Sequence, residues 1–249
     1  MTNILLFGAM GKMGRVVSQC VAQRDDCQII AGIDKFSDGS ADFPVYPTIT
    51  DFKDTCDVII DFSHPSVFDE LLRYCVQNKV PAVICTTGLS AEQIAAIHTA
   101  AETVPLFYSA NMSLGINLLR ALAQKAVEVL GGQYDIEIIE KHHNQKVDAP
   151  SGTALMLADA INTAAGGQYE YVYDRHSVRK KRDKRELGLH AVRGGTIVGE
   201  HEILFAGRDE VITLSHSAAS KEVFAVGAVQ AARFMQGKGP GLYDMADMI

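Results

Sequence analysis

Residues 140–153 hold a high density of groups that can move protons or bind anions. The adjacent imidazoles of His142 and His143 are followed by the ammonium of Lys146 and by the turn Ser151-Gly152-Thr153. Imidazole is the side chain best suited to proton transfer near neutral pH. A helix that opens at a Ser-Gly-Thr turn presents hydroxyl and N–H groups that can hold a carboxylate. The segment therefore predicts a site that binds an anionic substrate and gives it a proton.

Two other interpretations of this segment stay open. The paired histidines and Asp148 could ligate zinc, but further ligands at a familiar spacing are missing from the sequence. The segment could also be a polar structural loop, although so many titratable groups in one turn are typical of a functional site. We predict no bound metal, and we interpret Asp148 as a residue that shapes the turn or orients Lys146.

A second group of residues, near the N-terminus, has the pattern of a dinucleotide-binding loop. The stretch Gly8-Ala9-Met10-Gly11-Lys12-Met13-Gly14 joins a strand-like run, Asn3–Phe7, to a helix-like segment. Glycines at this point let the backbone approach a pyrophosphate, whose charge a helix start favours. Asp34 ends the next strand, where a carboxylate can hold ribose hydroxyls, and Lys35 can pair with a 2′-phosphate. The pattern predicts NADH or NADPH as cofactor, with a glycine-rich turn and a solvated Asp-Lys pair as the alternative.

Three further strand ends carry polar or small residues. They are Asp61–Pro65, Cys85–Gly88 and Ser109–Met112. In an open α/β sheet, ligands bind beyond the C-terminal ends of the strands. Each loop alone could be ordinary turn chemistry, but three loops in register with the glycine loop favour a cofactor groove.

The elements that must position these residues alternate over the first half of the chain. Strand-like runs at Asp57–Phe62, Pro81–Cys85 and Val104–Tyr108 are separated by helix-like segments. Pro65 sits near the start of one of these helices, and Ser90 with Gln93 has the pattern of a capping box at the start of the next. This alternation predicts an α/β fold with a Rossmann-like, doubly wound parallel sheet.

After Asn111 the pattern changes to an α+β one, which predicts an inserted domain with a largely antiparallel or mixed sheet. The expected elements are helix Ser113–Leu130, strand Tyr134–Lys141, helix Thr153–Ala165, strands Leu189–Arg193, Ile197–Ala206 and Glu210–Ser215, and helix Lys221–Gln236. We predict a dinucleotide-binding domain from residues 1–112 and 216–249, and a substrate-binding domain from residues 113–215.

Composition narrows the class of protein. The chain has 249 residues, of which 47% are hydrophobic and 21% charged, as in ordinary globular proteins. It shows no bilayer-spanning apolar run and no secretory signal. Five cysteines without C-x-x-C spacing fit the reduced thiols of a cytoplasmic protein. The net charge of −7 argues against nucleic acid as a partner. Basic residues gather within 175–185, which we interpret as a solvated loop rather than a nucleic-acid or anion surface.

Motifs along the whole chain resemble those of the dihydrodipicolinate reductase family. In order, they are GAMGKMG, DFSHP, TTG, ANMS, EKHHNQKVDAPSGTAL, HAVRGG, VGEH and FAVGAVQAA. The resemblance implies reduction of a dihydrodipicolinate-type cyclic imine diacid to tetrahydrodipicolinate in lysine and diaminopimelate biosynthesis, with NADH or NADPH. It also implies a homotetramer assembled through the sheet of the inserted domain.

The resemblance also implies a role for each matching residue. His142 would protonate the ring carbon beside the site of hydride delivery, and Lys146 would assist it. The substrate-binding residues would be His143, Lys146, Ser151, Gly152 and Thr153. The cofactor-binding residues would be Gly8, Ala9, Met10, Gly11, Lys12, Met13, Asp34, Lys35, Phe62, Cys85, Thr86, Thr87, Gly88, Ser109, Ala110, Asn111 and Met112. Lys12 stands where the family often has arginine, and Cys85 where it often has glycine.

Two other functions remain compatible with the sequence. One is a different small Rossmann oxidoreductase that acts on an amino-acid imine, although such an enzyme has no evident need for the histidine pair, the lysine and the Ser-Gly-Thr turn together. The other is a dinucleotide-sensing regulator that uses the basic residues within 175–185 to contact nucleic acid.

Overall fold

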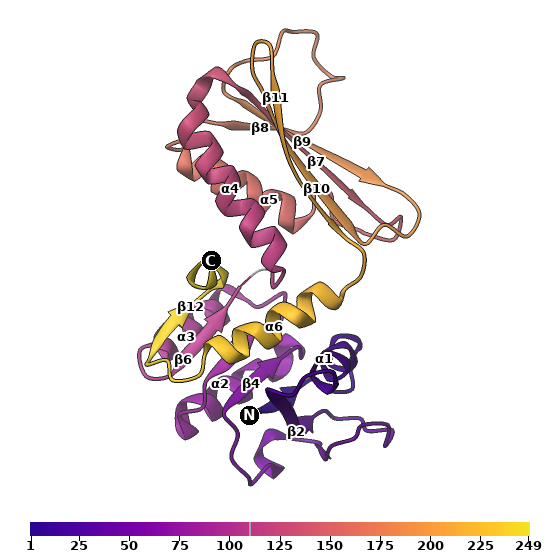
Figure 1. The fold of residues 1–249 in the computed structure, drawn as a ribbon, viewed down its shortest axis with the longest axis vertical. Helices are drawn as coiled ribbons and strands as arrows, with labels where there is room; N and C mark the ends of the chain where they lie inside the picture. The colour runs from indigo at the N-terminus through magenta and orange to yellow at the C-terminus, as the bar shows by residue number, and fades with distance from the viewer. Residues whose placement is uncertain (110) are drawn as a thin grey trace. The chain divides into compact units, whose positions relative to one another are not determined.

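The computed structural model describes residues 1–109 and 111–249 and separates into two compact units. Unit 1 consists of Met1–Leu114 and Lys221–Ile249, and unit 2 consists of Gly115–Ser220. Both units are drawn in Figure 1. No helix in the described part of the chain combines the length and the hydropathy of a membrane span.

Unit 1 is built on a seven-stranded sheet whose neighbouring strands are all parallel. In sheet order the strands are β12 (Gly241–Tyr243), β6 (Pro105–Tyr108), β5 (Ala82–Ile84), β4 (Val58–Asp61), β1 (Thr2–Phe7), β2 (Cys27–Ile33) and β3 (Val45–Tyr46). The predicted Rossmann-like parallel sheet is confirmed. The sequence did not predict β3 and β12, because two or three residues are too few to show a periodic pattern.

Helices cover both faces of this sheet. They are α1 (Lys12–Ala22), α2 (Pro65–Asn78), α3 (Ala91–Ala101) and α6 (Glu222–Phe234). Ile4 and Leu6 pack with α1 and α6 in one apolar cluster, while Leu5 and Phe7 pack with α2 and α3 in the other. Alternate residues of β1 therefore enter opposite cores, as expected for a parallel strand buried on both faces. Figure 1 shows α1 and α6 side by side, and the two helices make many contacts.

Local sequence explains where two of these helices begin. The Nδ1 of His64 accepts a hydrogen bond from the Ser66 N–H at the start of α2, and Pro65 occupies the first turn. At the start of α3, the Ser90 hydroxyl accepts from the Gln93 N–H, and the Gln93 side chain accepts from the Ser90 N–H. The predicted capping box is therefore present.

Unit 2 is built on a mixed five-stranded sheet. In sheet order the strands are β11 (Val211–Ala218), β10 (Gly199–Ala206), β7 (Asp135–His142), β9 (Glu186–Arg193) and β8 (Glu170–Val172). β10 runs antiparallel to β11 and β7, whereas β7, β9 and β8 run parallel to one another. The sequence placed the start of β9 three residues late and missed β8. The error at β9 arises because Glu186 is acidic, yet it lies buried in ion pairs with Arg175 and Lys180.

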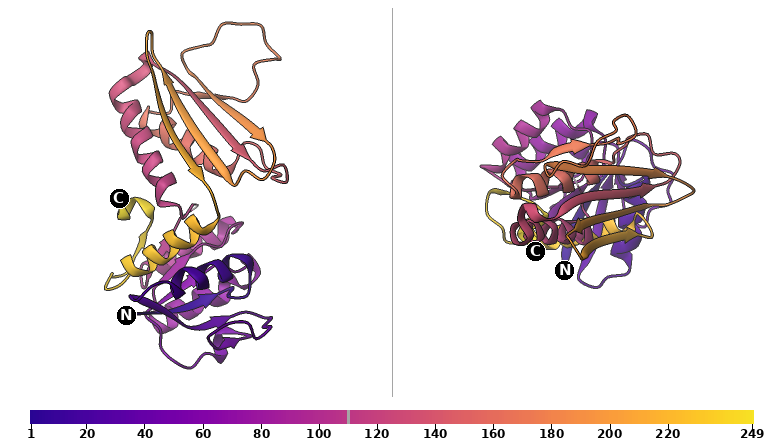
Figure 2. Two further views of the ribbon diagram at one scale, coloured as in Figure 1. Left: turned by 45° about the vertical axis from the view of Figure 1, so that its right-hand side comes forward. Right: turned by 90° about the horizontal axis from the view of Figure 1, so that it is seen from above.

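The two helices of unit 2, α4 (Leu114–Leu130) and α5 (Gly152–Ala164), lie on the same side of its sheet (Figures 1 and 2). Ile136 and Ile138 of β7 pack in the core that these helices cover. Glu140 and His142 continue the same alternation and are also buried. Polar groups at the end of β7 therefore enter the helix-covered face rather than solvent.

Helix α6 packs tightly against the loop after β6. A Cβ atom at Gly227 would lie 1.7 Å from the carbonyl oxygen of Met112, a backbone atom that cannot move aside easily. Glycine at this position therefore lets α6 close over the end of the parallel sheet.

We predict that Gly227→Ala destabilises the protein by about 1–3 kcal/mol or more, because the added methyl overlaps backbone. Thermal unfolding followed by circular dichroism should show a lower Tm. Gly239→Ala is the matched control, since a Cβ there meets no atom within 4 Å. Equal Tm values for the two variants would contradict the packing described for Gly227.

Candidate active site

His142 is the last residue of β7 and is only 8% exposed. Its Nδ1 lies 2.6 Å from Oε2 of Glu140, which precedes it by two residues on the same face. An ionised carboxylate can only accept, so Nδ1 carries a proton and donates it to Glu140. Nε2 is the other reactive position of the ring. Gly199, at the start of β10, gives it space, because a Cβ there would lie 3.1 Å from Nε2.

The Glu140 carboxylate is fully buried and accepts four hydrogen bonds. Arg193 of β9 donates to both oxygens, each at 2.7 Å, and the Ser151 N–H donates to Oε1 at 3.0 Å. Burial by itself would raise the pKa of Glu140, but the hydrogen bonds from Arg193, His142 and Ser151 outweigh burial and lower it. The carboxylate therefore stays ionised beside His142.

Ser151 caps α5, its hydroxyl accepting from the Ala154 N–H at 3.1 Å. Ser151 is buried, whereas the next residue, Gly152, is exposed, and Thr153 is half-buried. The start of α5 therefore presents N–H groups at its surface, an arrangement that suits an anion. The Ser151 hydroxyl also lies 3.1 Å from Nε2 of His201 in β10.

The loop between β7 and α5 carries Lys146 and His143. The Lys146 Nζ lies 2.8 Å from Oδ1 of Asp148, and its backbone N–H donates to the carbonyl of His143. The Asp148 carbonyl accepts from Arg193 at 2.6 Å. Asp148 therefore has the geometry predicted for it: it holds Lys146, and Arg193 ties the loop to the same guanidinium that binds Glu140. His143 is half-buried at the strand end.

In unit 1 the glycine loop is pressed against its neighbours. Gly8 has a φ of +78°, and a Cβ there would lie 2.6 Å from the carbonyl oxygen of Phe62, in the loop after β4. The Asp34 carboxylate accepts from the Met10 N–H at 3.0 Å and from the Phe36 N–H at 3.1 Å. Asp34 and the glycine loop are therefore joined directly.

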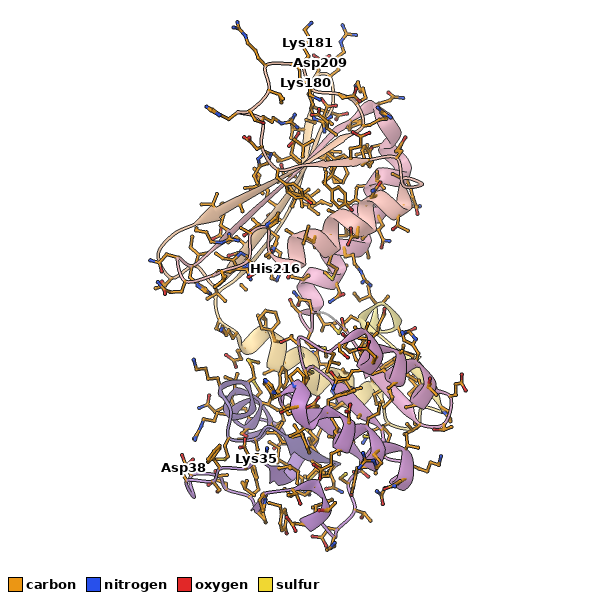
Figure 3. The ribbon with its side chains drawn as sticks, turned by 180° about the vertical axis from the view of Figure 1, so that it is seen from behind. Lys35, Asp38, Lys180, Lys181, Asp209 and His216 are labelled. Atoms are coloured by element: carbon orange, nitrogen blue, oxygen red, sulfur yellow. The ribbon has the colours of Figure 1, made fainter. Side chains whose placement is uncertain are left out.

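A cavity of about 420 Å³ lies beside this loop. Five of the predicted cofactor residues line it, namely Gly8, Gly11, Asp34, Lys35 and Phe62. Residues that the sequence analysis did not connect with the cofactor also line it, among them Phe36, Val67 and Glu70. Figure 3 shows Lys35 and Asp38 on the segment that follows β2. A Cβ at Gly8 would narrow this cavity. The Asp34 carboxylate, the Lys35 ammonium and the backbone of the glycine loop fit the ribose and phosphates of a dinucleotide.

Two of the other strand-end loops, those after β4 and β5, are joined by Asp61, which is fully buried. The Thr86 hydroxyl and the Ser63 N–H donate to its two oxygens at 2.7 Å and 2.9 Å. Burial raises the pKa of Asp61 despite these bonds. The loop after β4 is thereby tied to the loop after β5, where Thr87 and Gly88 are exposed. Cys85 turns its thiol into the apolar core, which leaves its backbone as the part that can contact a ligand.

The remaining predicted cofactor residues differ in their surroundings. Ser109 donates through its hydroxyl to the Asn111 carbonyl, and the Asn111 side chain accepts from the Ser113 N–H. Met112 is buried beneath α6. Ala110 lies outside the described residues. In the glycine loop, Ala9 is buried, Met10 and Met13 are half-buried and Lys12 is exposed.

The basic segment is largely paired with acids of its own unit. Arg175 contacts Glu137 and Glu186, Lys180 contacts Glu186, and Arg182 contacts Asp135 and Glu137. The left view of Figure 2 shows the loop between β8 and β9, and Figure 3 marks Lys180 and Lys181 on it. These pairs favour a structural loop over a nucleic-acid surface. Within residues 1–109 and 111–249, no cluster of three or more His, Cys, Asp or Glu side chains is arranged to hold a metal.

Comparison with known proteins covers both units. A family model described as dihydrodipicolinate reductase, N-terminus, matches residues 2–112, and one described as dihydrodipicolinate reductase, C-terminus, matches residues 115–249. The 4-hydroxy-tetrahydrodipicolinate reductase of Caldanaerobacter subterraneus subsp. tengcongensis is 50% identical over 249 residues, which cover 100% of this chain and 98% of the relative. The enzyme of the same name from Clostridium tetani is 49% identical, over 100% of this chain and 97% of the relative.

One solved structure is similar over its full length. It is a dihydrodipicolinate reductase from Paenisporosarcina sp. TG-14 with dipicolinate bound, with a TM-score of 0.82 and 26% sequence identity. The match covers 100% of both chains.

We predict that Arg193→Met destabilises the protein by about 3–5 kcal/mol at neutral pH, because it leaves the Glu140 charge buried without its main partner. Arg208→Met is the matched control, since Arg208 is 96% exposed and only loosely paired. Urea unfolding of both variants measures the effect. Equal stabilities for the two variants would contradict the role given to Arg193.

The loss should also depend on pH. In the native protein the pKa of Glu140 is lowered below its ordinary value of 4.5, so its stabilising contribution is complete above that pH and is lost as the pH falls further. In Arg193→Met, burial without the guanidinium raises the pKa of Glu140, and uptake of a proton then removes the unpaired buried charge that destabilises the variant. The difference in unfolding free energy between the wild type and Arg193→Met should therefore become smaller between about pH 7 and pH 4.

Proposed function

The chain belongs to the dihydrodipicolinate reductase family, and we propose on that premise how its two units divide the reaction. The protein is a nicotinamide-dependent oxidoreductase that reduces a dihydrodipicolinate-type cyclic imine diacid to tetrahydrodipicolinate, a step of lysine and diaminopimelate biosynthesis. Unit 1 binds the dinucleotide, and unit 2 binds the substrate. A small dicarboxylate as ligand is supported by the dipicolinate bound to the similar structure.

One observation supports this proposal more than any other. The buried carboxylate of Glu140 holds both the His142 ring and the Ser151 N–H at the start of α5. A proton donor and an anion-binding helix start are therefore fixed to the same group. A reductase of an anionic ring needs this combination, because the proton must arrive while the carboxylates hold the ring in place.

The chemistry follows from which nitrogen of His142 is occupied. A reduced nicotinamide, when bound, supplies the hydride, and negative charge then builds on the neighbouring carbon of the substrate. Protonated His142 donates to that carbon through Nε2, because Nδ1 is engaged by Glu140. The ionised Glu140 stabilises the imidazolium before transfer and keeps the Nδ1–H tautomer afterwards. Lys146 assists as a second positive group, held by Asp148.

The two carboxylates of the substrate need fixed donors in a site from which water is excluded. The groups proposed to bind them are His143, the Lys146 ammonium, the Ser151 hydroxyl, and the residues Gly152 and Thr153 at the start of α5. The ammonium and the helix start both attract negative charge, so they favour a diacid over a neutral ring.

The cofactor is proposed to be either NADH or NADPH. Asp34 suits the free ribose hydroxyls of NADH, and the exposed Lys35 suits the 2′-phosphate of NADPH. The remaining predicted cofactor residues are proposed to act through the backbone of the glycine loop and through the three strand-end loops, two of which Asp61 joins.

The assembly is proposed to be a homotetramer formed through the sheet of unit 2. Support comes from the face of this sheet that α4 and α5 do not cover, because it carries apolar side chains. The strand register places Ile139, Leu204 and Val192 on that face, and Val192 is exposed. A cytoplasmic location is proposed as well, supported by five free thiols.

A direct assay separates this function from its rivals. Substrate generated by the preceding synthase is supplied, and the oxidation of NADH or NADPH is followed by absorbance. Turnover is expected. Binding of DNA that depends on NADH, without turnover, would support the regulator, and turnover of simple amino-acid imines alone would support a different oxidoreductase.

His142→Gln should lower kcat by about 10²-fold or more, because it removes the general acid while filling a similar volume. The Kd for NADH should change little, since His142 lies in unit 2. His98→Gln, on the exposed surface of α3, is the matched control. A near-normal kcat for His142→Gln would remove it from the acid role.

Lys35→Ala should weaken NADPH binding by about tenfold and NADH binding far less, because only NADPH carries the 2′-phosphate. Calorimetry with both dinucleotides measures the difference, with Lys125→Ala in unit 2 as the control. Equal losses for NADH and NADPH would show that Lys35 does not meet the phosphate.

A further inference from the structure

His201 is a buried polar residue to which the proposed mechanism gives no task. It lies on β10 opposite Glu140 in the strand register and is only 5% exposed. Its ring meets that of His142 edge to face, with the centroids 5.2 Å apart. Nε2 lies 3.1 Å from the Ser151 hydroxyl, and Nδ1 is buried with no partner among the described residues.

The His201 ring is neutral at physiological pH. Burial, and next the charge of His142, lower its pKa to about 4. A neutral imidazole carries one proton, on either Nδ1 or Nε2. The two tautomers have different consequences for Ser151.

With the proton on Nδ1, the ring would bury an N–H donor that has no acceptor, and Ser151 would donate its only hydroxyl proton to Nε2. With the proton on Nε2, the ring donates to Ser151, and only a lone pair at Nδ1 is left unpaired. Buried N–H groups without a partner are rarer than acceptors without one. The surroundings therefore favour the proton on Nε2.

This tautomer fixes the direction of the Ser151 hydroxyl. Its oxygen then accepts from two donors, the His201 Nε2–H and the Ala154 N–H. Both lone pairs are used, so the hydroxyl proton must be given to a third group. The Ser151 N–H is already bound to Glu140, which leaves the hydroxyl as the free donor of this residue.

We propose that His201 is a positioning residue that makes Ser151 a fixed hydroxyl donor to a carboxylate of the substrate. The inference rests on the proposed function, in which Ser151 binds that carboxylate. The fixed direction of the Ser151 hydroxyl would also make the site select ligands that accept a hydrogen bond at this point. An ionised carboxylate only accepts, so it matches the oriented hydroxyl, whereas a ligand group that must donate at that point does not.

The test measures the Kd for dipicolinate by calorimetry in a double-mutant cycle of His201→Leu and Ser151→Ala. We expect His201→Leu to raise the Kd about tenfold, and to have no further effect when Ser151 is already alanine. His201→Gln should restore most of the affinity, because its amide can donate to the same hydroxyl. The Kd for NADH should stay constant in all variants.

His216→Leu is the matched control. His216 faces His201 across the β10–β11 pair, its pKa is also lowered by burial, and Figure 3 marks it on β11. It has no hydrogen bond to Ser151 among those of the described residues. Its replacement should leave dipicolinate binding unchanged.

A second measurement reads the tautomer directly. ¹⁵N NMR of the wild-type protein should show His201 protonated on Nε2 and not on Nδ1. Protonation on Nδ1, or a full additional loss of affinity from His201→Leu in the Ser151→Ala background, would overturn the inference. Failure of the wild type to bind dipicolinate would instead count against the substrate assignment, and the NMR result would still decide the tautomer if a variant did not fold.

Discussion

The carboxylate of Glu140 constrains unit 2 more than any other single group. A buried charge is tolerated only when it is paired and hydrogen-bonded, and here the four donors come from three places in the chain. Arg193 reaches it from β9, His142 from the end of its own strand and Ser151 from the start of α5. Satisfying one carboxylate therefore requires the β7–β9 register, the strand end and the start of α5 to be correct together. The site is precise because its parts share this partner.

In unit 1, two other carboxyl groups also hold loops in place by accepting hydrogen bonds. Asp34 accepts from backbone N–H groups of the glycine loop and of the segment after β2, and Asp61 ties the loop after β4 to Thr86. In each case a carboxylate at a strand end fixes a loop by binding its N–H or hydroxyl groups. Such loops gain a defined shape without a large apolar core of their own.

Local patterns in the sequence were enough to predict the parallel sheet and the helices α1 to α6, and to single out the histidine pair as a candidate, because each pattern lies within one segment. The cluster around Glu140 could not be predicted in the same way. Glu140 lies on the same face of its strand as Ile136 and Ile138, but Arg193 and His201 are more than 50 residues away, so only the strand register brings them together. The VGEH motif did contain His201, but no spacing in it indicates a contact with Ser151. The start of β9 was missed because Glu186 is buried only through ion pairs with Arg175 and Lys180 of the loop before the strand, and no periodic pattern in that loop indicates the pairing.

The path of the chain through the two units affects its folding during synthesis. One of the two cores of unit 1 contains Ala225, Ala228 and Val229 of α6, and β12 completes the edge of its sheet. These residues are translated after all of unit 2. During synthesis, residues 1–114 of unit 1 therefore remain with one apolar face of the sheet uncovered by α6, whereas unit 2 is a continuous segment that can fold as soon as it has emerged.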